Sequence, residues 1–345
     1  MFYKITLPIF LLFSIAYGSE YELVNAVRKD LRAYNEFMAE YYNEFTAGIE
    51  TAAIKKHIEM EWGNRFADWE RAAKAGIPEG QILLAVCYYY GANVPRNYKE
   101  ESQWLRKAAE QGHTEAQNRL ALNYFTGRGV PDDKAEAVKW LRKAAEQGDA
   151  KAQNYLGEHY LNEVPKDETN AVKLFRSAME QGNIKAQCNL GVCYLYGNGV
   201  PADAAAGMSL LRKSAEQGCI NAQHRLGILY LEGKIIPKDL AEGIAWLRKA
   251  AEQGDFIAQK NLSKCYVNGY GVPKDDTEAA KWFQAAERGM NEARKEVCES
   301  FANTLEEDIA EALTEMVLEE FTKIKSIKAN LSNHRRIYQR KLIRR

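Results

Sequence analysis

The chain has 345 residues, and its 47 basic and 47 acidic side chains cancel to a formal net charge of zero. A balanced chain gives no electrostatic argument for nucleic acid or an acidic ligand as the partner. With 46% hydrophobic and 11% aromatic residues, it is also too apolar for an intrinsically disordered protein, so we expect it to fold.

The first eighteen residues have the pattern of a secretory signal peptide. A short segment with one positive charge precedes an apolar run, and Ala16 and Gly18 place small residues at the −3 and −1 positions of a cleavage site. An uncleaved anchor is the alternative, but a spanning helix needs about 20 apolar residues, and this run is shorter and contains Pro8. We predict that 1–18 is a signal peptide, that no transmembrane segment remains after cleavage, and that the chain is periplasmic or secreted, or lumenal in the endoplasmic reticulum of a eukaryote.

A helical segment is expected next, from residue 21 to about residue 48. Its apolar residues alternate spacings of three and four, as on one face of a helix. They are Val24, Val27, Leu31, Tyr34, Met38, Tyr41 and Phe45. Such a seam suits either a helix that covers the end of a repeat array or a coiled coil between two copies of the chain. We assign 19–76 to an N-terminal helical cap, whose end from residue 66 is similar to half of a repeat.

One phrase recurs through the middle of the chain, with its clearest copy, WLRKAAEQGD, from Trp140 to Asp149. A glycine closes each copy, and successive closing glycines lie 34 to 36 residues apart. They are Gly76, Gly112, Gly148, Gly182, Gly218, Gly254 and Gly289. The expected units are therefore 77–112, 113–148, 149–182, 183–218, 219–254 and 255–289. A fixed period of this length indicates repeats that each touch only their neighbours.

Each unit has the pattern of two helices joined by a turn. In the first helix, apolar residues at spacings of three and four form one buried face, which ends in a tyrosine. This tyrosine recurs as Tyr88, Tyr124, Tyr160, Tyr194, Tyr230 and Tyr266, which indicates a packing position. A glycine that tolerates a left-handed backbone then ends the first helix in five units, and a proline follows in all six.

An asparagine or aspartate two residues after the proline is expected to cap the second helix. These residues are Asn97, Asp133, Asp167, Asp203, Asp239 and Asp275. The unit 149–182 is two residues shorter than its neighbours and lacks the loop glycine, so we expect a tighter turn there.

These motifs resemble the Sel1-like repeat family, which is related to the tetratricopeptide repeats. The resemblance rests on Ala-x3-Leu-Gly-x2-Tyr, Gly-x-Gly-Val-Pro-x-Asp and Ala-x2-Trp-Leu-Arg-Lys-Ala-Ala-Glu-Gln-Gly, repeated in this order. It implies an all-α fold, a right-handed α-solenoid of about six helix-turn-helix repeats, here with helical caps at both ends. It also implies a non-catalytic adaptor or scaffold that binds protein, because members of the family typically have that role and many are exported.

The six cysteines are not arranged as a disulfide framework. Cys87, Cys193 and Cys265 each lie eleven residues after a closing glycine, so they occupy one repeated site and are expected to be small buried apolar residues. One branch of the resembled family pairs cysteines within each repeat, whereas most units here hold one cysteine or none. Cys188 and Cys219 are placed to meet across neighbouring repeats, and the sequence leaves a disulfide between them open.

The segment 290–345 is expected to cap the other end of the array. It begins like another first helix and continues with acidic residues, followed by nine Lys or Arg without an acid from Lys323 to Arg345. This charge order complements a helix dipole, which favours a solvated capping helix. The alternative is a basic tail that tethers the protein to an anionic surface such as lipid headgroups.

The sequence contains no recognisable catalytic, cofactor-binding or metal-binding motif. HExxH, a phosphate-binding GxxxxGK[ST] and a GxSxG elbow are absent, and the five histidines are scattered over different units. Catalysis needs unlike residues that converge on one place, whereas here the same residues repeat. We therefore predict that the protein is not an enzyme and uses no cofactor or metal. A secreted enzyme, or an enzyme inhibitor, that acts on cell-wall polymers is the alternative.

The predicted binding surface is the concave face of the solenoid, on the side of the first helices opposite their buried face. Its positions fall six, seven, ten and fourteen residues after a closing glycine and, unlike the packing positions, they vary. The candidates are Asn118, Leu122, Asn154, Glu158, His224, Ile228, Lys260 and Lys264. Polar side chains interspersed with Leu and Ile suit an extended peptide or a helix of a protein partner. For any single residue, plain solvated surface is the alternative.

Overall fold

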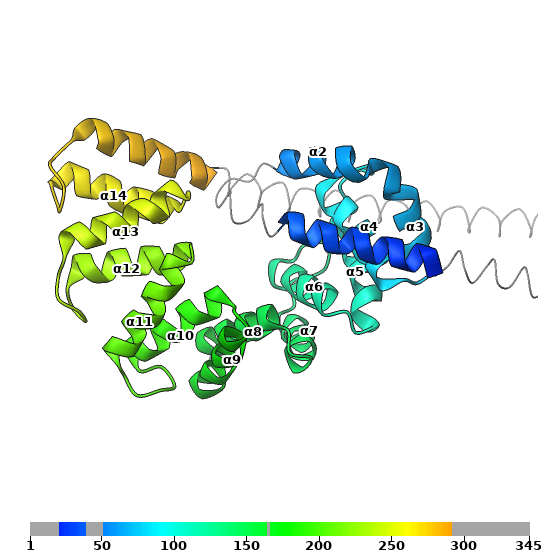
Figure 1. The fold of residues 1–345 in the computed structure, drawn as a ribbon, viewed down its shortest axis with the longest axis horizontal. Coiled ribbons are helices and arrows are strands. Elements are labelled where there is room, and N and C mark those ends of the chain that lie inside the picture. Colours follow the sequence, from blue (N-terminus) through cyan, green and yellow to red (C-terminus); the bar gives the residue numbers. More distant parts are fainter. Residues whose placement is uncertain (1–20, 39–50, 164–165, 292–345) are drawn as a thin grey trace, which may run out of the picture. The chain divides into compact units, whose positions relative to one another are not determined.

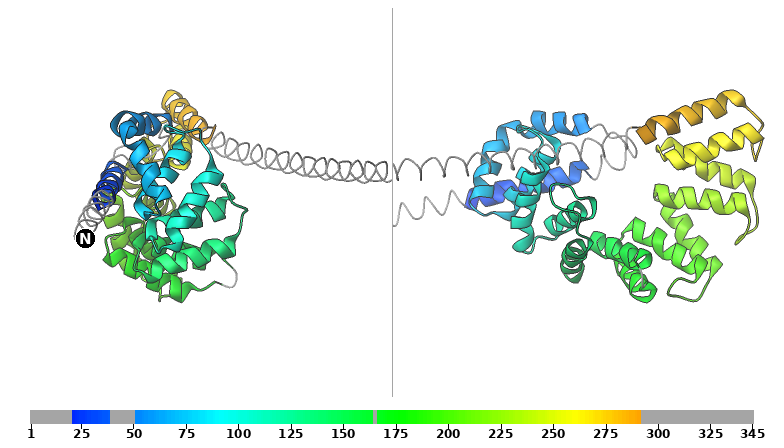
Figure 2. Two further views of the ribbon diagram at one scale, coloured as in Figure 1. Left: turned by 90° about the vertical axis from the view of Figure 1, so that its right-hand side faces the viewer. Right: turned by 180° about the vertical axis from the view of Figure 1, so that it is seen from behind.

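The computed structural model describes residues 21–38, 51–163 and 166–291. Within these ranges the protein consists of helices and turns, with no strand. The helices form consecutive packed pairs, and each one packs mainly against the next along the chain (Figures 1 and 2). This is the predicted α-solenoid. The predicted signal peptide 1–18 and the basic tail from Lys323 lie outside the described residues.

The repeat array is built from helices of equal length. Each helix from α4 to α14 has 13 residues, and a further helix spans 276–291. The bounds are α4 Pro78–Tyr90, α5 Tyr98–Glu110, α6 Thr114–Thr126, α7 Lys134–Glu146, α8 Ala150–Asn162, α9 Glu168–Glu180, α10 Ile184–Tyr196, α11 Ala204–Glu216, α12 Ile220–Glu232, α13 Leu240–Glu252 and α14 Phe256–Asn268. The shorter third unit keeps both helix lengths, so its deletion falls entirely in the turn between α8 and α9.

The N-terminal segment contributes helix 21–38, α2 (Thr51–Trp62), a short 3-10 helix (Gly63–Arg65) and α3 (Phe66–Lys74). Of the predicted stripe in helix 21–38, Val27, Leu31, Tyr34 and Met38 are buried, whereas Val24 is only partly buried. The ring of Tyr34 lies edge-on to Trp62 at 6.2 Å between centroids. Asp30 Oδ2 accepts a hydrogen bond from Trp69 Nε1 at 2.8 Å. Over residues 21–38 the seam therefore packs within its own chain, while Tyr41 and Phe45 lie outside the described residues.

The predicted caps of the second helices are confirmed in all six units. Asp133 Oδ1, for example, accepts from the backbone N–H of Glu136 at 3.0 Å. The cap is itself held in place, because its N–H donates to the carbonyl of the repeated tyrosine, from Asp133 to Tyr124 at 3.0 Å. The same bond joins Asp167 to Tyr160 at 2.9 Å. The shortened turn therefore still brings the cap to the tyrosine.

The side chain of the repeated tyrosine joins neighbouring units. Its hydroxyl accepts from the arginine 18 residues earlier, in the second helix of the preceding unit. Arg176 Nη2 donates to Tyr194 at 3.1 Å, and Arg248 Nη2 donates to Tyr266 at 2.6 Å. The equivalent pairs are Arg106–Tyr124, Arg142–Tyr160 and Arg212–Tyr230. The arginine of WLRKAAEQG and the tyrosine therefore recur together because they form one contact.

A buried glutamine makes a second link across the same boundary and is held by a glutamine of its own unit. Gln117 is buried in α6 and donates through Nε2 to the carbonyl of Ala109 at 3.0 Å. Its Oε1 accepts from Gln147 Nε2, also at 3.0 Å. A buried amide is costly unless both of its polar atoms find partners, which explains why both glutamines recur.

The closing glycines end the second helices in a left-handed conformation, as predicted. Gly112 has a φ of 91°, its N–H donates to Ala109, and the next N–H, of His113, donates to Ala108. This pair of bonds is a Schellman motif. For Gly289 the prediction is wrong, because helix 276–291 runs through it without a positive φ. The helix continues through Met290 to residue 291.

The turn between the two helices of a unit rests directly on the preceding unit. Gly127 ends α6 with a φ of 64°, as predicted, and Gly129 follows with a φ of 63°. A Cβ atom on Gly129 would lie 2.0 Å from the carbonyl oxygen of Tyr98, the first residue of α5. The equivalent Gly199 approaches the carbonyl oxygen of Glu168 in the same way, with a Cβ distance of 2.3 Å. Only glycine allows this close approach between units.

Candidate functional site

The first helices of the units carry all eight candidate residues away from the apolar stripe that ends in the repeated tyrosine. Of these tyrosines, Tyr124 and Tyr266 are buried and the other four are partly buried. We call the side with the candidates the first-helix face and define it by the positions six, ten and fourteen residues after each closing glycine. In the described units beyond the first, these are residues 118, 122, 126, 154, 158, 162, 188, 192, 196, 224, 228, 232, 260, 264 and 268.

Asn118 and Asn154 belong to the packing between units, since they are only 6% and 2% exposed. Asn118 Nδ2 donates to Asp149 Oδ1 at 2.7 Å. The same oxygen caps α8 by accepting from the N–H of Ala152 at 2.8 Å. A polar link therefore joins α6 to the N-terminus of α8.

Asn154 and Glu158 of α8 form a second polar group with Asn189 of α10. Asn189 Nδ2 donates to Asn154 Oδ1 at 2.9 Å and to Glu158 Oε1 at 2.8 Å. Asn154 Nδ2 donates to the same Glu158 oxygen at 3.0 Å. Both polar atoms of Asn154 are thus used inside the chain, whereas Glu158 stays partly exposed.

His224 bridges α12 and α14 at the equivalent position. Its Nδ1 lies 3.5 Å from Asp255 Oδ2, and its Nε2 lies 3.3 Å from Asn261 Nδ2. Burial lowers the pKa of His224 below 6.5, Arg225 acts in the same direction, and Asp255 opposes both. The imidazole is therefore neutral at pH 7, and its contact with Asp255 is a polar contact between a neutral ring and a carboxylate.

The other four candidates are open to solvent to different degrees. Leu122 of α6 is 36% exposed, Ile228 of α12 is half-buried, and Lys260 and Lys264 of α14 are exposed. They are distributed over three first helices, so they suit a partner that extends along several units.

Tyr196 is a further residue of the first-helix face, which sequence reasoning did not single out. It is the last residue of α10 and is 57% exposed. A recess of about 450 Å³ beside it is lined by Leu195, Tyr196, Leu229, Glu232, Lys234 and Ile235. Its apolar wall comes from α10 and α12, which belong to neighbouring units. The sequence did indicate an unusual residue here, because the position fourteen residues after the closing glycine holds Thr, Asn or Glu in four other units.

Glu101 of α5 is a buried carboxyl group that sequence reasoning also missed. It is 3% exposed, and its Oε2 has no hydrogen-bond partner among the described residues. Burial raises the pKa of Glu101 to about 7, although the positive charges of Arg119 and Arg128 and a hydrogen bond from Asn123 favour the ionised form. The other five units hold Ala or Gly at this position, which is the sequence signal for an exceptional residue.

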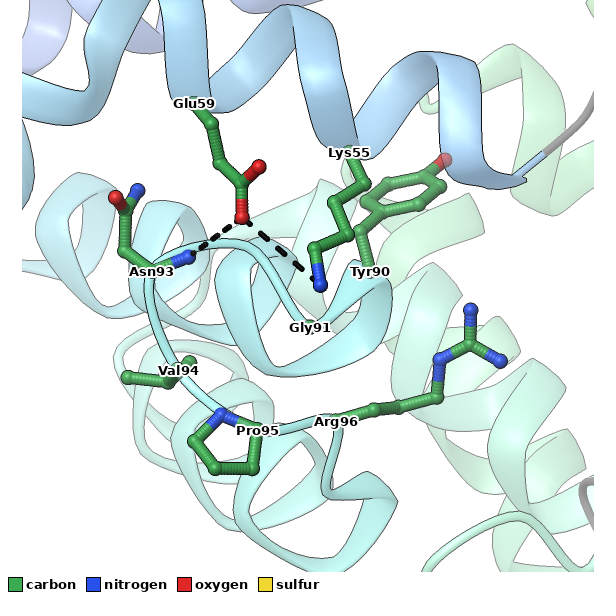
Figure 3. Close-up of a pocket in the computed structure, with 8 residues that line it drawn as sticks. All are labelled: Lys55, Glu59, Tyr90, Gly91, Asn93, Val94, Pro95 and Arg96. Atoms are coloured by element: carbon green, nitrogen blue, oxygen red, sulfur yellow. Dashed lines mark hydrogen bonds and ion pairs between the residues drawn. The ribbon is translucent and has the colours of Figure 1, made fainter.

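A second recess, of about 540 Å³, lies between α2 and the turn after α4 (Figure 3). Its lining residues are Lys55, Glu59, Tyr90, Gly91, Asn93, Val94, Pro95 and Arg96. Glu59 Oε1 accepts from the N–H of Asn93 at 3.5 Å and lies 3.9 Å from Lys55 Nζ. The recess marks the junction between the cap and the first unit, and its lining includes no paired nucleophile and base.

Two other kinds of site are absent from the described residues. Neither the repeat units nor helices 21–38, α2 and α3 bring three or more His, Cys, Asp or Glu side chains together as metal ligands. Across the same ranges, no helix is both long and apolar enough to span a bilayer.

The family model described as "Sel1 repeat" matches six segments of the chain, 78–113, 114–149, 150–183, 184–219, 220–255 and 257–289. The first five begin one residue after the units expected from the closing glycines. No curated protein matches the chain.

The solved structures similar to this chain include a Sel1 repeat protein and a bacterial antigen. A Sel1 repeat protein from Oxalobacter formigenes is 30% identical over 69% of this chain and 97% of that protein, with a TM-score of 0.61. A protective antigen present in uropathogenic Escherichia coli strains, which displays an SLR fold, is 35% identical over 65% of this chain, with a TM-score of 0.54. The alignment with the antigen covers 48% of the antigen's own length.

Proposed function

This chain belongs to the Sel1 repeat family, whose members generally act as protein-interaction scaffolds, and we propose that it is itself a non-catalytic scaffold. Its binding surface is the exposed part of the first-helix face, which we take to be the concave side of the solenoid. The observation that supports this most is the exposure of large apolar side chains on that face, above all Tyr196 beside its recess.

The chemistry of the face indicates the kind of partner. Tyrosine is enriched among the residues that contribute most to protein interfaces, because it buries a large ring and keeps a polar end. Tyr196 and the apolar wall between α10 and α12 suit an apolar side chain of the partner. Lys260 and Lys264 of α14 suit an acidic group further along the same segment. An extended peptide or a helix of a protein partner meets both requirements.

The expected result for Tyr196→Ala is a partner affinity at least tenfold weaker, because the aromatic anchor is lost. A tenfold change in Kd corresponds to about 1.4 kcal/mol. The partner is first captured with a photo-reactive amino acid at position 196 and identified by mass spectrometry, and Kd is then measured by calorimetry.

The matched control is Phe283→Ala, which removes an exposed aromatic ring of helix 276–291 outside the first-helix face and should alter Kd by less than about twofold. Circular dichroism checks that both variants keep their helical content. Equal affinities of wild type and Tyr196→Ala for the captured partner would show that the recess is not the binding site.

We further propose that the scaffold is exported and acts outside the cytoplasm. The support is the charge, apolar run and small residues of 1–18. N-terminal sequencing of the protein purified from its natural source should begin at Ser19. A mature protein that still begins at Met1 would contradict cleavage after Gly18.

A further inference from the structure

A cross-repeat pair forms between two fixed positions of the array. The side chain six residues after a closing glycine meets the residue that directly follows the next closing glycine. Asn118 and Asp149 form this pair at 2.7 Å, and His224 and Asp255 form it at 3.5 Å. Between α10 and α12 the same two positions hold Cys188 and Cys219.

The two side chains belong to one apolar cluster. Cys188 is a buried member of this cluster, together with Ala215 and Ala222, and Cys219 packs against it. Cys188 is 2% exposed, whereas Cys219 is partly exposed at the N-terminus of α12. The backbone of Cys219 is fixed because its N–H donates to the carbonyl of Ser214 at 3.1 Å.

We propose that Cys188 and Cys219 are a redox-active pair that a low-molecular-weight disulfide oxidises to a disulfide bond between α10 and α12. The Cys219 thiolate, having lost its proton to solvent, attacks one sulfur of the small disulfide. The small S–S bond breaks, one small thiolate leaves and takes up a proton, and Cys219 carries a mixed disulfide.

The Cys188 thiol completes the exchange. It loses its proton and attacks the sulfur of Cys219, which breaks the mixed disulfide and releases the second small molecule as a thiol. The protein pair loses two electrons and two protons in total, and the small disulfide is reduced to two thiols.

The surroundings assign the attacking role to Cys219. The hydrogen bond from Cys188, supported by Ser214 and by the N–H of Ala222, lowers the pKa of Cys219 to about 6, against the effect of burial. The nearby charges are Lys185 of α10, Arg225 of α12 and Glu158 of α8. The same contact and burial raise the pKa of Cys188, which therefore stays a thiol until Cys219 has reacted.

The other described cysteines lack these conditions. Cys87, Cys193 and Cys265 are buried, and burial raises the pKa of each thiol, to about 12 for Cys87 and about 11 for Cys193. A buried thiol with a raised pKa is a poor nucleophile. Among the described cysteines, oxidation is therefore directed to Cys188 and Cys219.

The first test treats the fully reduced, full-length protein with oxidised glutathione at pH 7 and measures its intact mass. Wild type should lose two hydrogens and retain no glutathione. Because Cys188 and Cys193 fall in one tryptic peptide, fragment spectra assign the bond, and Cys193→Ala, the matched control, should still form it. A wild-type protein that gains no disulfide, or forms it through Cys193, overturns the proposal.

Variants of the pair separate the two steps. Cys188→Ser should stop at a stable mixed disulfide on Cys219. Cys219→Ser should form neither a mixed disulfide on Cys188 nor a disulfide bond between α10 and α12. Labelling spread equally over the buried cysteines in Cys188→Ser would contradict the assigned order. If a variant fails to fold by circular dichroism, the wild-type measurement decides alone.

A pH profile provides a readout that a merely structural pair would not give. Brief iodoacetamide labelling of Cys219 in wild type should rise with a midpoint near pH 6, compared with about 8.5 for an ordinary thiol. At pH 7 this corresponds to roughly thirtyfold more thiolate than an ordinary cysteine has. A midpoint above pH 8 would exclude Cys219 as the attacking group.

Discussion

Replacing Gly129 with alanine is expected to destabilise the protein by about 3 kcal/mol or more, a larger effect than at the neighbouring Gly127. A left-handed backbone costs a non-glycine residue about 1–2 kcal/mol, and forced overpacking adds about 1–3 kcal/mol. The steric part arises because the new Cβ would lie 2.0 Å from the carbonyl oxygen and 2.2 Å from the carbonyl carbon of Tyr98. Backbone at the start of α5 cannot give way as a flexible side chain would.

Gly127→Ala is the matched control, since it changes a glycine of the same turn with nearly the same φ. Its Cβ would come no closer than 3.6 Å to Asp132, which is ordinary contact, so only the cost of the backbone conformation remains. The measurement is the urea midpoint of unfolding, followed by circular dichroism. Equal shifts for Gly127→Ala and Gly129→Ala would mean that the turn does not rest on the preceding unit.

Glu101 is expected to make the free energy of unfolding fall as the pH rises. Its pKa is about 7 in the folded chain, compared with the ordinary value of 4.5, because burial disfavours the carboxylate. Between these values the folded state holds a proton that the unfolded state has released, so stability is lost from pH 4.5 to 7 and changes little above. The shift corresponds to about 3 kcal/mol, and solvent screening reduces it little because the side chain is almost wholly buried.

Glu101→Gln removes this titration. Urea unfolding gives the free energy of unfolding of both proteins at pH 4.5 and at pH 8. Between these two pH values, the stability of the variant relative to wild type should rise by about 3 kcal/mol. Glu110→Gln, on the exposed side of the same helix, serves as the control and should follow the wild-type pH dependence. A constant difference between wild type and Glu101→Gln over this pH range would show that the carboxyl group does not titrate abnormally.

The fold could be predicted almost completely because its determinants are local and repeated. The caps such as Asp133, the turn glycines such as Gly127 and the tyrosine stripe act within about twenty residues, and each copy supports the others. Gly289 was mispredicted for the same reason. Its helix continues to residue 291 although a glycine stands at the closing position, and the repeat pattern by itself does not say which copy is the last.

The binding face was harder to predict, because the repeat period along the sequence does not show which side chains of neighbouring units are in contact. Position six was expected to face outward, yet in Asn118 and Asn154 it is buried and forms polar links to the next unit. Such links depend on the distance between successive first helices, which the spacing along the chain does not give. Tyr196 was detectable only because four other units hold Thr, Asn or Glu at its position, although the first unit also holds a tyrosine there, Tyr90.

The links that recur at the unit boundaries have a consequence for the length of the array. Arginine donates to tyrosine, and the first-helix glutamine donates to an alanine carbonyl, in the same way at several boundaries, so these boundaries are built alike. Copies are therefore interchangeable building blocks, and a whole unit can be inserted or deleted without creating a new kind of joint. The number of units then sets the length of the first-helix face, and this length does not depend on the stability of any one contact between units. Differences between units are confined to positions outside these links, such as those of Glu101, Cys188 and Tyr196.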